Sequence, residues 1–140
     1  MYLLDTDHLS VLERGGAASA PLYRRLQAIA PTAVAATVVS YEEQTRGWFS
    51  VMAQARSLDE QVLAYRYLQR HLQVFCRVPL LAFDAAAVTI VKQLQQQRIR
   101  IGSMDLKIAG IALAQDATLV TRNGKDFQKV PELRIEDWTV

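Results

Sequence analysis

The distribution of apolar and polar residues predicts strands that alternate with helices along the chain. Short apolar or β-branched runs predict buried strands, whereas apolar residues spaced three and four apart predict helices with one buried face. The expected strands are residues 2–4, 33–40, 78–83, 118–121 and an edge strand within 133–138. The expected helices are residues 8–14, 20–30, 40–55, 57–73, 85–97 and 104–114. This alternation predicts an α/β fold, with a central parallel sheet flanked by helices and right-handed crossovers.

Polar residues at the predicted helix starts indicate where the helices begin. Ser19 is expected to cap the second helix, and Ser40 with Glu43 has the spacing of a capping box. Ser57 and Glu60 have the same spacing at the start of the longest helix. The two helices within residues 40–73 are expected to form one projecting hairpin of the same domain.

Composition narrows the class of protein. A chain of 140 residues with 51% hydrophobic residues is sufficient for one domain with a sizeable core. The net charge of +2 creates no strong global field, so a polyanion would need a local basic patch. A single cysteine, Cys76, and two histidines exclude an internal disulfide and most zinc sites, so any metal should be a hard cation held by oxygens. The chain has neither a membrane-spanning stretch nor a secretion signal, which predicts a cytoplasmic protein with no membrane partner.

Acidic residues gather where predicted strands end or where the following helices begin. They are Asp5, Glu42, Glu43, Asp105 and Asp126. Each also has an ordinary structural explanation: Asp5 or the nearby Asp7 could cap a helix, and Asp105 would interact favourably with a helix dipole. Because the carboxyl ends of parallel strands meet at one edge, the acids would repel one another there. A shared cation is the simplest explanation for the whole set.

Four segments in this order resemble the PIN-domain ribonuclease toxins of the VapC type. They are LLDTDHLS, SYEEQTRGW, IGSMDLKIAGIALA and ATLVTRNGKDF, followed near the C-terminus by LRIEDW. The resemblance covers essentially the whole chain and implies a single PIN domain over residues 1–140. It also implies a metal-dependent endoribonuclease that hydrolyses RNA phosphodiester bonds with Mg²⁺ or Mn²⁺ and acts as the toxin of a type II toxin–antitoxin system.

The resemblance assigns the acids position by position. The family's first acid matches Asp5, its helix acid matches Glu43, four residues before Gly47, and its third acid matches Asp105. The fourth position matches Asn123 or Asp126. Many relatives carry an aspartate where this chain has Asn123, and an aspartate at the position of Asp126 is also typical of the family.

The same resemblance implies a role for each of these groups. Asp5 and Asp105 would bind the metal directly, Glu43 would bind the metal or its water, and Asp126 would complete an outer shell. Thr121 matches a hydroxyl residue that supports the first acid, and Asp7 could replace the charge missing at Asn123. Glycine spacing and capping-box spacing both favour Glu43 over its neighbour Glu42.

Basic residues near the motifs are candidates for contacts with RNA phosphates, although ordinary surface charge explains each equally well. These candidates are Arg46, Lys107, Arg122 and Lys125, with Arg98 and Arg100 as a second basic strip. The expected substrate is RNA, with structured RNA such as tRNA or rRNA among the candidates.

Resemblance to the toxin family also implies a cognate antitoxin and a homodimer. The hairpin segment carries five large residues that an antitoxin helix could contact: Trp48, Phe49, Met52, Tyr65 and Tyr67. At least half of them are expected in the core, and the remainder in an apolar groove for an amphipathic antitoxin helix. A basic antitoxin side chain would then reach the carboxylates.

Two other functions remain open from sequence alone. A catalytically silent PIN-like domain that only binds RNA or protein is supported by Asn123. A receiver-type phospho-acceptor domain also places acids at strand ends, but it would need an acceptor aspartate after a middle strand and a lysine after a later one. Metal-dependent RNA cleavage would distinguish the first alternative, and acetyl-phosphate labelling the second.

Overall fold

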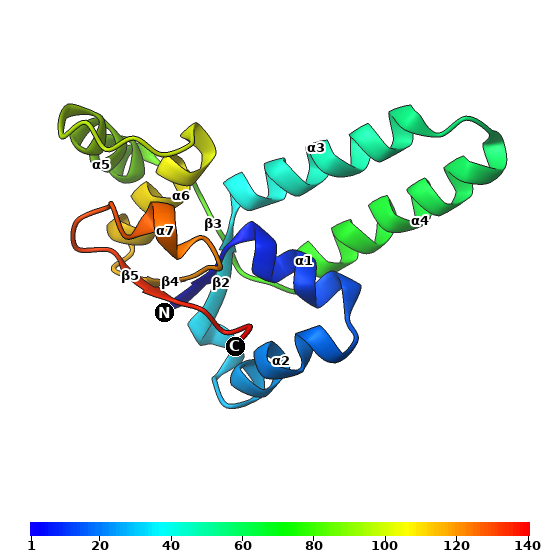
Figure 1. Cartoon of the computed structure of the whole chain (residues 1–140), viewed down its shortest axis with the longest axis horizontal. Helices are drawn as coiled ribbons and strands as arrows, with labels where there is room; N and C mark the ends of the chain where they lie inside the picture. Colours follow the sequence, from blue (N-terminus) through cyan, green and yellow to red (C-terminus); the bar gives the residue numbers. More distant parts are fainter.

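The computed structural model describes residues 1–140 as a five-stranded parallel sheet with helices on both faces (Figure 1). The strands are β1 (Tyr2–Leu4), β2 (Val34–Thr37), β3 (Leu80–Leu81), β4 (Thr118–Val120) and β5 (Arg134–Glu136). Their order is β3-β2-β1-β4-β5, and every neighbouring pair is parallel. The α/β class with a central parallel sheet is therefore confirmed, as is the pairing of β1 with β4 at its centre.

The helices connect consecutive strands. They are α1 (Thr6–Arg14), α2 (Ala20–Gln27), α3 (Val38–Gln54), α4 (Leu58–Phe75), α5 (Ala85–Gln96), α6 (Ser103–Ala114) and α7 (Gly124–Phe127), with 3₁₀ turns at Ala17–Ser19 and Pro31–Ala33. None of these helices combines the length and apolar character needed to cross a membrane.

Successive residues of the inner strands point to opposite faces of the sheet and build two cores. Leu3 and Leu119 pack with residues of α5 and α6 on one face. Leu4 and Val120 pack with residues of α1 and α2 on the other. Each of these four side chains is at most 2% exposed, and burying one stabilises the fold by about 1.5–3 kcal/mol. Residues from both cores therefore hold β1 in place, and β1 leads directly into the first acid.

Helices α3 and α4 form the expected hairpin, which projects from the body of the domain (Figure 1). Its large side chains are more exposed than the sequence predicted. Phe49 and Tyr65 are 57% and 59% exposed, while Trp48 and Met52 are only partly buried. The expectation that at least half of this group would be core is wrong, because the sheet lies beyond the reach of most of the hairpin.

The boundary between the second strand and its helix differs from the prediction. Val38 and Val39 are β-branched, which favours a strand over residues 33–40, yet β2 ends at Thr37. The Thr37 hydroxyl accepts a hydrogen bond from the Ser40 amide at 3.0 Å, so Thr37 caps α3 in place of Ser40. Val39 is buried in the core, where packing offsets its weaker helix propensity.

The predicted caps of two further helices have different outcomes. At α4 the prediction is confirmed, because the Ser57 hydroxyl accepts a hydrogen bond from the Glu60 amide at 3.1 Å. Ser19, however, makes no capping bond to α2. Ser19 is the last residue of the 3₁₀ turn Ala17–Ser19, and its hydroxyl donates to the Gly16 carbonyl. Helix α2 follows this turn directly, at Ala20.

Helices α5 and α6 approach most closely at Gly110. A Cβ atom at this position would lie 2.7 Å from Val91 Cγ2 and 3.0 Å from the Ala87 carbonyl oxygen. We expect Gly110→Ala to lower the free energy of unfolding by about 1–3 kcal/mol through overpacking. Urea denaturation measures this change, and Gly47→Ala is the matched control, since nothing lies within 4 Å of a Cβ at Gly47. Equal stability of the two variants would contradict the close packing of α5 on α6.

Candidate active site

Asp5 lies where the central strand β1 ends and α1 begins. Its Oδ1 accepts a hydrogen bond from the Thr6 amide at 2.7 Å, and its Oδ2 accepts one from the Thr121 hydroxyl at 2.8 Å. Asp5 thus follows the end of β1 and caps α1, so the capping explanation is confirmed, and its role as a site acid stays a prediction. Burial raises the pKa of its carboxyl to about 6, and the two hydrogen bonds oppose that rise.

Glu43 faces Asp5 from the first turns of α3. The Thr6 hydroxyl donates to Glu43 Oε1 at 3.1 Å, which links the helix after β1 to the helix after β2. Burial is the main cause that raises the pKa of Glu43, and the charge of Asp105 adds to it. Glu42 points elsewhere and pairs with Arg46 at 2.6 Å, so that arginine, a candidate for phosphate binding, is already partnered.

Asp105 and Asp126 approach from the opposite side and share one partner. The Asn123 amide Nδ2 donates to Asp105 Oδ2 and to Asp126 Oδ2, at 3.2 Å in each case. The pKa of Asp105 is raised, first by burial and then by the charge of Asp126. The pKa of Asp126, which lies nearer the solvent, is lowered chiefly by the hydrogen bond from Asn123.

The loop after β4 is tied to α1 by Asp7 and Thr121. Asp7 Oδ2 accepts a hydrogen bond from the Arg122 amide at 3.2 Å, while its Oδ1 lies 3.1 Å from Nδ1 of the buried His8. The Thr121 hydroxyl accepts a hydrogen bond from the backbone N–H of Asn123 at 3.0 Å and donates one to Asp5. These bonds fix the position of Asn123 relative to the first acid.

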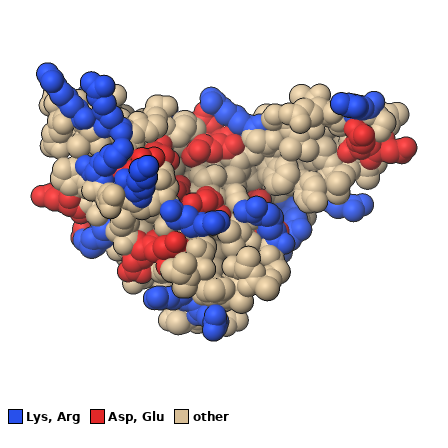
Figure 2. All heavy atoms as spheres, in the orientation of Figure 1, with Lys and Arg blue, Asp and Glu red and all other residues tan.

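The basic residues that are candidates for phosphate contacts form no ion pair with Asp5, Glu43 or Asp105, the three acids whose pKa values are raised. Lys107 is placed over the Phe83 ring at 5.9 Å from its centroid, and Arg122 and Lys125 are exposed. Lys129, which the sequence analysis missed, lies 3.4 Å from Asp126. Figure 2 shows acidic atoms gathered where the body meets the base of the hairpin, with basic side chains around them.

The donor set fits a hard divalent cation. The charges that act on Asp5, Glu43 and Asp105 all come from other carboxylates and none comes from a lysine or arginine. Carboxylate oxygens and the Asn123 carbonyl are the ligands that Mg²⁺ and Mn²⁺ prefer. No group of three Asp, Glu, His or Cys side chains has the arrangement of a preformed metal site, so the carboxylates would have to draw closer around an ion.

Thr6 is the site residue that sequence reasoning missed. Its hydroxyl contacts both Glu43 and Ser40, and its amide contacts Asp5. Its place between Asp5 and Asp7 was the available signal, since a residue between two candidate ligands lies at the same end of the strand. Thr6 can thus orient two acids, Asp5 through its backbone N–H and Glu43 through its hydroxyl.

Curated relatives of this chain are ribonucleases. The chain is 37% identical over 75 residues to ribonuclease VapC2 of Rickettsia felis. This match covers 50% of this chain and 56% of that protein. It is 37% identical over 67 residues to the tRNA(fMet)-specific endonuclease VapC of Shigella flexneri. That match covers 45% of this chain and 51% of the Shigella protein. The chain thus spans about half the length of the curated relatives it matches. No protein-family model matches the chain.

Solved structures extend the likeness to the whole chain. VapBC2 from Rickettsia felis, bound to a DNA fragment from its promoter, matches with a TM-score of 0.73 and 25% identity, covering 98% of each chain. VapBC-1 from nontypeable Haemophilus influenzae matches with a TM-score of 0.74 and 25% identity, covering 99% of this chain and 98% of the other. In sequence the chain is therefore similar to VapC ribonucleases, and in fold it is similar to chains of VapBC complexes.

Proposed function

We propose that the protein is a Mg²⁺- or Mn²⁺-dependent endoribonuclease that acts in the cytoplasm as the toxin of a type II toxin–antitoxin system. The observation that carries this proposal is the set of uncompensated carboxylates at one edge of the sheet. Burial and mutual repulsion raise the pKa values of Asp5, Glu43 and Asp105, and no basic side chain relieves them. A cation would relieve this repulsion, and the related VapC proteins are ribonucleases.

In this proposal Asp5 and Asp105 hold the metal, Glu43 holds the metal or its water, and Asp126 completes an outer shell. A bound divalent cation supplies an activated water and neutralises charge on the phosphate oxygens. Thr121 and Thr6 orient the carboxylates of Asp5 and Glu43, to which they donate hydrogen bonds. The Asn123 side chain donates hydrogen bonds to the carboxylates of Asp105 and Asp126. The nearby Arg122 and Lys125 side chains form no ion pair and would contact RNA phosphates.

Incubation of the purified protein with RNA tests this function. Cleavage is expected with Mg²⁺ or Mn²⁺ and none with EDTA. Because the Shigella relative is a tRNA(fMet)-specific endonuclease, tRNA is the first substrate to test, followed by rRNA. Sequencing the new 5′ ends after brief induction in cells would then identify the natural target. Binding of RNA without cleavage in either metal would favour the silent alternative.

Asn123 provides a prediction about metal affinity. In Asn123→Asp a third carboxylate replaces the amide that donates to Asp105 and Asp126. We expect this variant to melt at a lower temperature than the parent in EDTA, because like charges then meet without a donor. With Mg²⁺ it should show a larger metal-induced rise in melting temperature than the parent. An unchanged rise would place residue 123 outside the ligand set and leave that role to Asp126.

A cognate antitoxin is the proposed partner, since the matched solved structures are VapBC complexes. The face of the hairpin away from α1 offers an apolar surface for it. Phe49, Tyr65 and Leu72 line a hollow of about 450 Å³ there and are each more than half exposed. An amphipathic antitoxin helix would cover this surface in the helix-in-groove manner. The further apolar residues near the tip of the hairpin, including Leu58 and Val62, would serve a homodimer.

Co-expression with the small open reading frame next to the gene tests the partner. The antitoxin is expected to restore growth and to copurify with the protein. Phe49→Ala with Tyr65→Ala should weaken this complex while leaving the metal-induced rise in melting temperature unchanged. Normal copurification of the double variant would place the antitoxin on another surface.

The proposed homodimer is tested separately, by light scattering, which measures the molar mass of the isolated protein in solution.

A further inference from the structure

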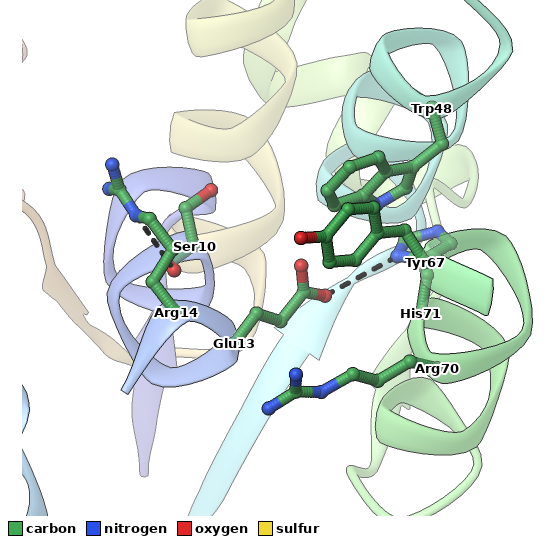
Figure 3. A pocket seen from close by; sticks show the side chains of 7 residues that line it. All are labelled: Ser10, Glu13, Arg14, Trp48, Tyr67, Arg70 and His71. Carbon is green, nitrogen blue, oxygen red and sulfur yellow. Dashed lines mark hydrogen bonds and ion pairs between the residues drawn. The ribbon is translucent and has the colours of Figure 1, made fainter. Parts of the chain in front are cut away.

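A hollow lies beside the carboxylates, between α1 and the base of the hairpin (Figure 3). Its volume is about 520 Å³, within the range of small-ligand sites. Glu13 and Arg14 line it from α1, and Trp48, Tyr67, Arg70 and His71 line it from α3 and α4. We call it the aromatic hollow. Only two of its lining residues are hydrophobic, which distinguishes it from the apolar hollow around Phe49.

Two aromatic rings form one wall of the aromatic hollow. The rings of Trp48 and Tyr67 stack on each other, with centroids 5.1 Å apart and planes 18° apart. Both side chains remain partly exposed, and Figure 3 shows them directed from the hairpin toward α1. A flat, prearranged aromatic surface suits a nucleobase, and stacking one base on such a surface contributes about 1–3 kcal/mol.

The charged side chains of this hollow also fit a nucleotide. Neither Arg14 nor Arg70 forms an ion pair. The Arg14 Nε donates a hydrogen bond to the Ser10 carbonyl at 3.3 Å (Figure 3), which leaves the two terminal nitrogens of Arg14 and the whole guanidinium of Arg70 available for a phosphate. Glu13 is the only acid, and its side chain is 10% exposed. Its Oε1 lies 3.5 Å from His71 Nδ1, and no hydrogen bond engages its other oxygen. A free carboxylate oxygen in a half-closed site can accept a hydrogen bond from an N–H group on the edge of a base.

His71, at the floor of the hollow, is held by contacts on several sides. His71 is 2% exposed, its Nε2 lies 2.8 Å from the Thr45 hydroxyl, and its ring stacks on Tyr41 at 5.2 Å. These contacts fix the imidazole and, through it, the carboxylate of Glu13. A positioned acceptor of this kind discriminates between bases better than a mobile surface carboxylate.

The aromatic hollow is continuous with the candidate active site. A second hollow of about 350 Å³ shares Ser10, Glu13 and Trp48 with it and is also lined by Thr6 and Glu43. Gly47 also lines the second hollow, and no atom from another element lies within 4 Å of where its Cβ would be. Glu43 and Trp48 are five residues apart on α3, or about 7.5 Å along the helix axis. A group held at Trp48 would therefore be close to a phosphate held at the carboxylates.

We propose that the aromatic hollow is the subsite for one unpaired nucleotide that flanks the scissile phosphate of an RNA substrate. Its base stacks on the Trp48 and Tyr67 pair, Glu13 accepts a hydrogen bond from the base, and Arg14 and Arg70 bind the adjoining phosphate. This inference rests on the proposed ribonuclease function and adds to it a requirement for single-stranded RNA next to the cut.

Binding of a fluorescein-labelled, single-stranded decaribonucleotide of mixed sequence tests the subsite. Fluorescence anisotropy is measured in EDTA, so that the RNA stays intact. Trp48→Ala is expected to weaken binding by about 5- to 150-fold, the equivalent of one stacked base. Trp48→Phe should restore much of that loss. Tyr23→Ala is the matched control, because Tyr23 is a 45% exposed aromatic residue on α2 that lines none of these hollows, and we expect it to bind as the parent does.

Two further probes separate the base from the backbone. An abasic oligonucleotide of the same length should bind the parent protein more weakly than the RNA does and should be insensitive to Trp48→Ala. Glu13→Gln should change the order of affinities among oligonucleotides that differ in one base. If the abasic strand binds as tightly as the RNA, the hollow recognises no base and the proposal is wrong.

The outcomes also separate this inference from the proposed function. If the protein cleaves RNA with Mg²⁺ while Trp48→Ala alters neither RNA binding nor KM, the subsite is wrong and the ribonuclease assignment stands. If Trp48→Ala leaves RNA binding intact but weakens the antitoxin complex, the hollow is a protein-docking site. If no RNA is cleaved with either metal while Trp48→Ala weakens RNA binding, the subsite stands as a binding site and the ribonuclease assignment fails.

Discussion

Asp105→Asn is expected to reduce the rate of RNA cleavage by about a hundredfold or more. Asp105 stands at the start of α6, facing Glu43 and Asp126, and in the proposed function it is one of the two direct metal ligands. Loss of a metal ligand removes several kcal/mol of transition-state stabilisation, and about 1.4 kcal/mol corresponds to a factor of ten in rate. Cleavage of a labelled RNA at saturating Mg²⁺ measures the effect.

The same substitution should not damage the fold, which makes the result interpretable. Repulsion from neighbouring carboxylates and burial both disfavour a charge at Asp105, so the neutral amide should raise the melting temperature of the metal-free protein. Asp59→Asn is the control, since Asp59 is exposed in the first turn of α4, at the far end of the hairpin. Cleavage at the parent rate by Asp105→Asn would refute the ligand assignment.

The metal-free protein is expected to lose stability as the pH rises from about 4 to about 6. The ordinary pKa of an aspartate carboxyl is 3.8, and burial raises the pKa of Asp5 to about 6 in the folded protein. Between these values the folded state holds a proton that the unfolded state has released, so raising the pH favours unfolding. The stability associated with protonated Asp5 is complete below about pH 4 and is lost as the pH passes about 6, a change on the order of 3 kcal/mol.

Urea denaturation in EDTA across this pH range tests that expectation. The raised pKa values of Glu43 and Asp105 act in the same direction as that of Asp5. Asp126 has a lowered pKa, so its contribution falls away only at lower pH. Asp5→Asn should remove most of the dependence of the free energy of unfolding on pH. Adding Mg²⁺ at pH 7 should raise the free energy of unfolding of the parent protein but not that of this variant. A parent protein whose stability rises steadily from pH 4 to 6 would show that Asp5 is not buried uncharged.

The elements that place the acids could be predicted from sequence because local signals and tertiary packing agree there. Tyr2–Leu4 is an apolar run that ends in Asp5, and Thr118–Val120 is an apolar run that precedes the polar loop carrying Asn123. Of the two neighbouring glutamates, Glu43 contacts Thr6 and Glu42 pairs with Arg46, so the prediction of Glu43 as the site acid is compatible with the geometry and stays a prediction.

Where the prediction failed, tertiary contacts decided the outcome. Val38 and Val39 favour a strand locally, but the Thr37 cap and the buried position of Val39 start a helix instead. The aromatic hollow could not be predicted, because Glu13, Trp48 and Tyr67 come from three helices and meet only in the folded chain. The exposure of Phe49 and Tyr65 depends on the angle at which the hairpin leaves the sheet, which no sequence pattern records.

His71 lines both the aromatic hollow and the apolar hollow proposed for the antitoxin. A single imidazole thus separates the surface proposed for RNA from the surface proposed for the antitoxin. Any occupant that moves His71 changes the shape of the other hollow, and thermodynamic linkage then requires the effect to be reciprocal. An antitoxin that loosens RNA binding through this wall would itself be loosened by RNA to the same degree. Inhibition would then depend on how much RNA competes for the protein, even though the two ligands never touch.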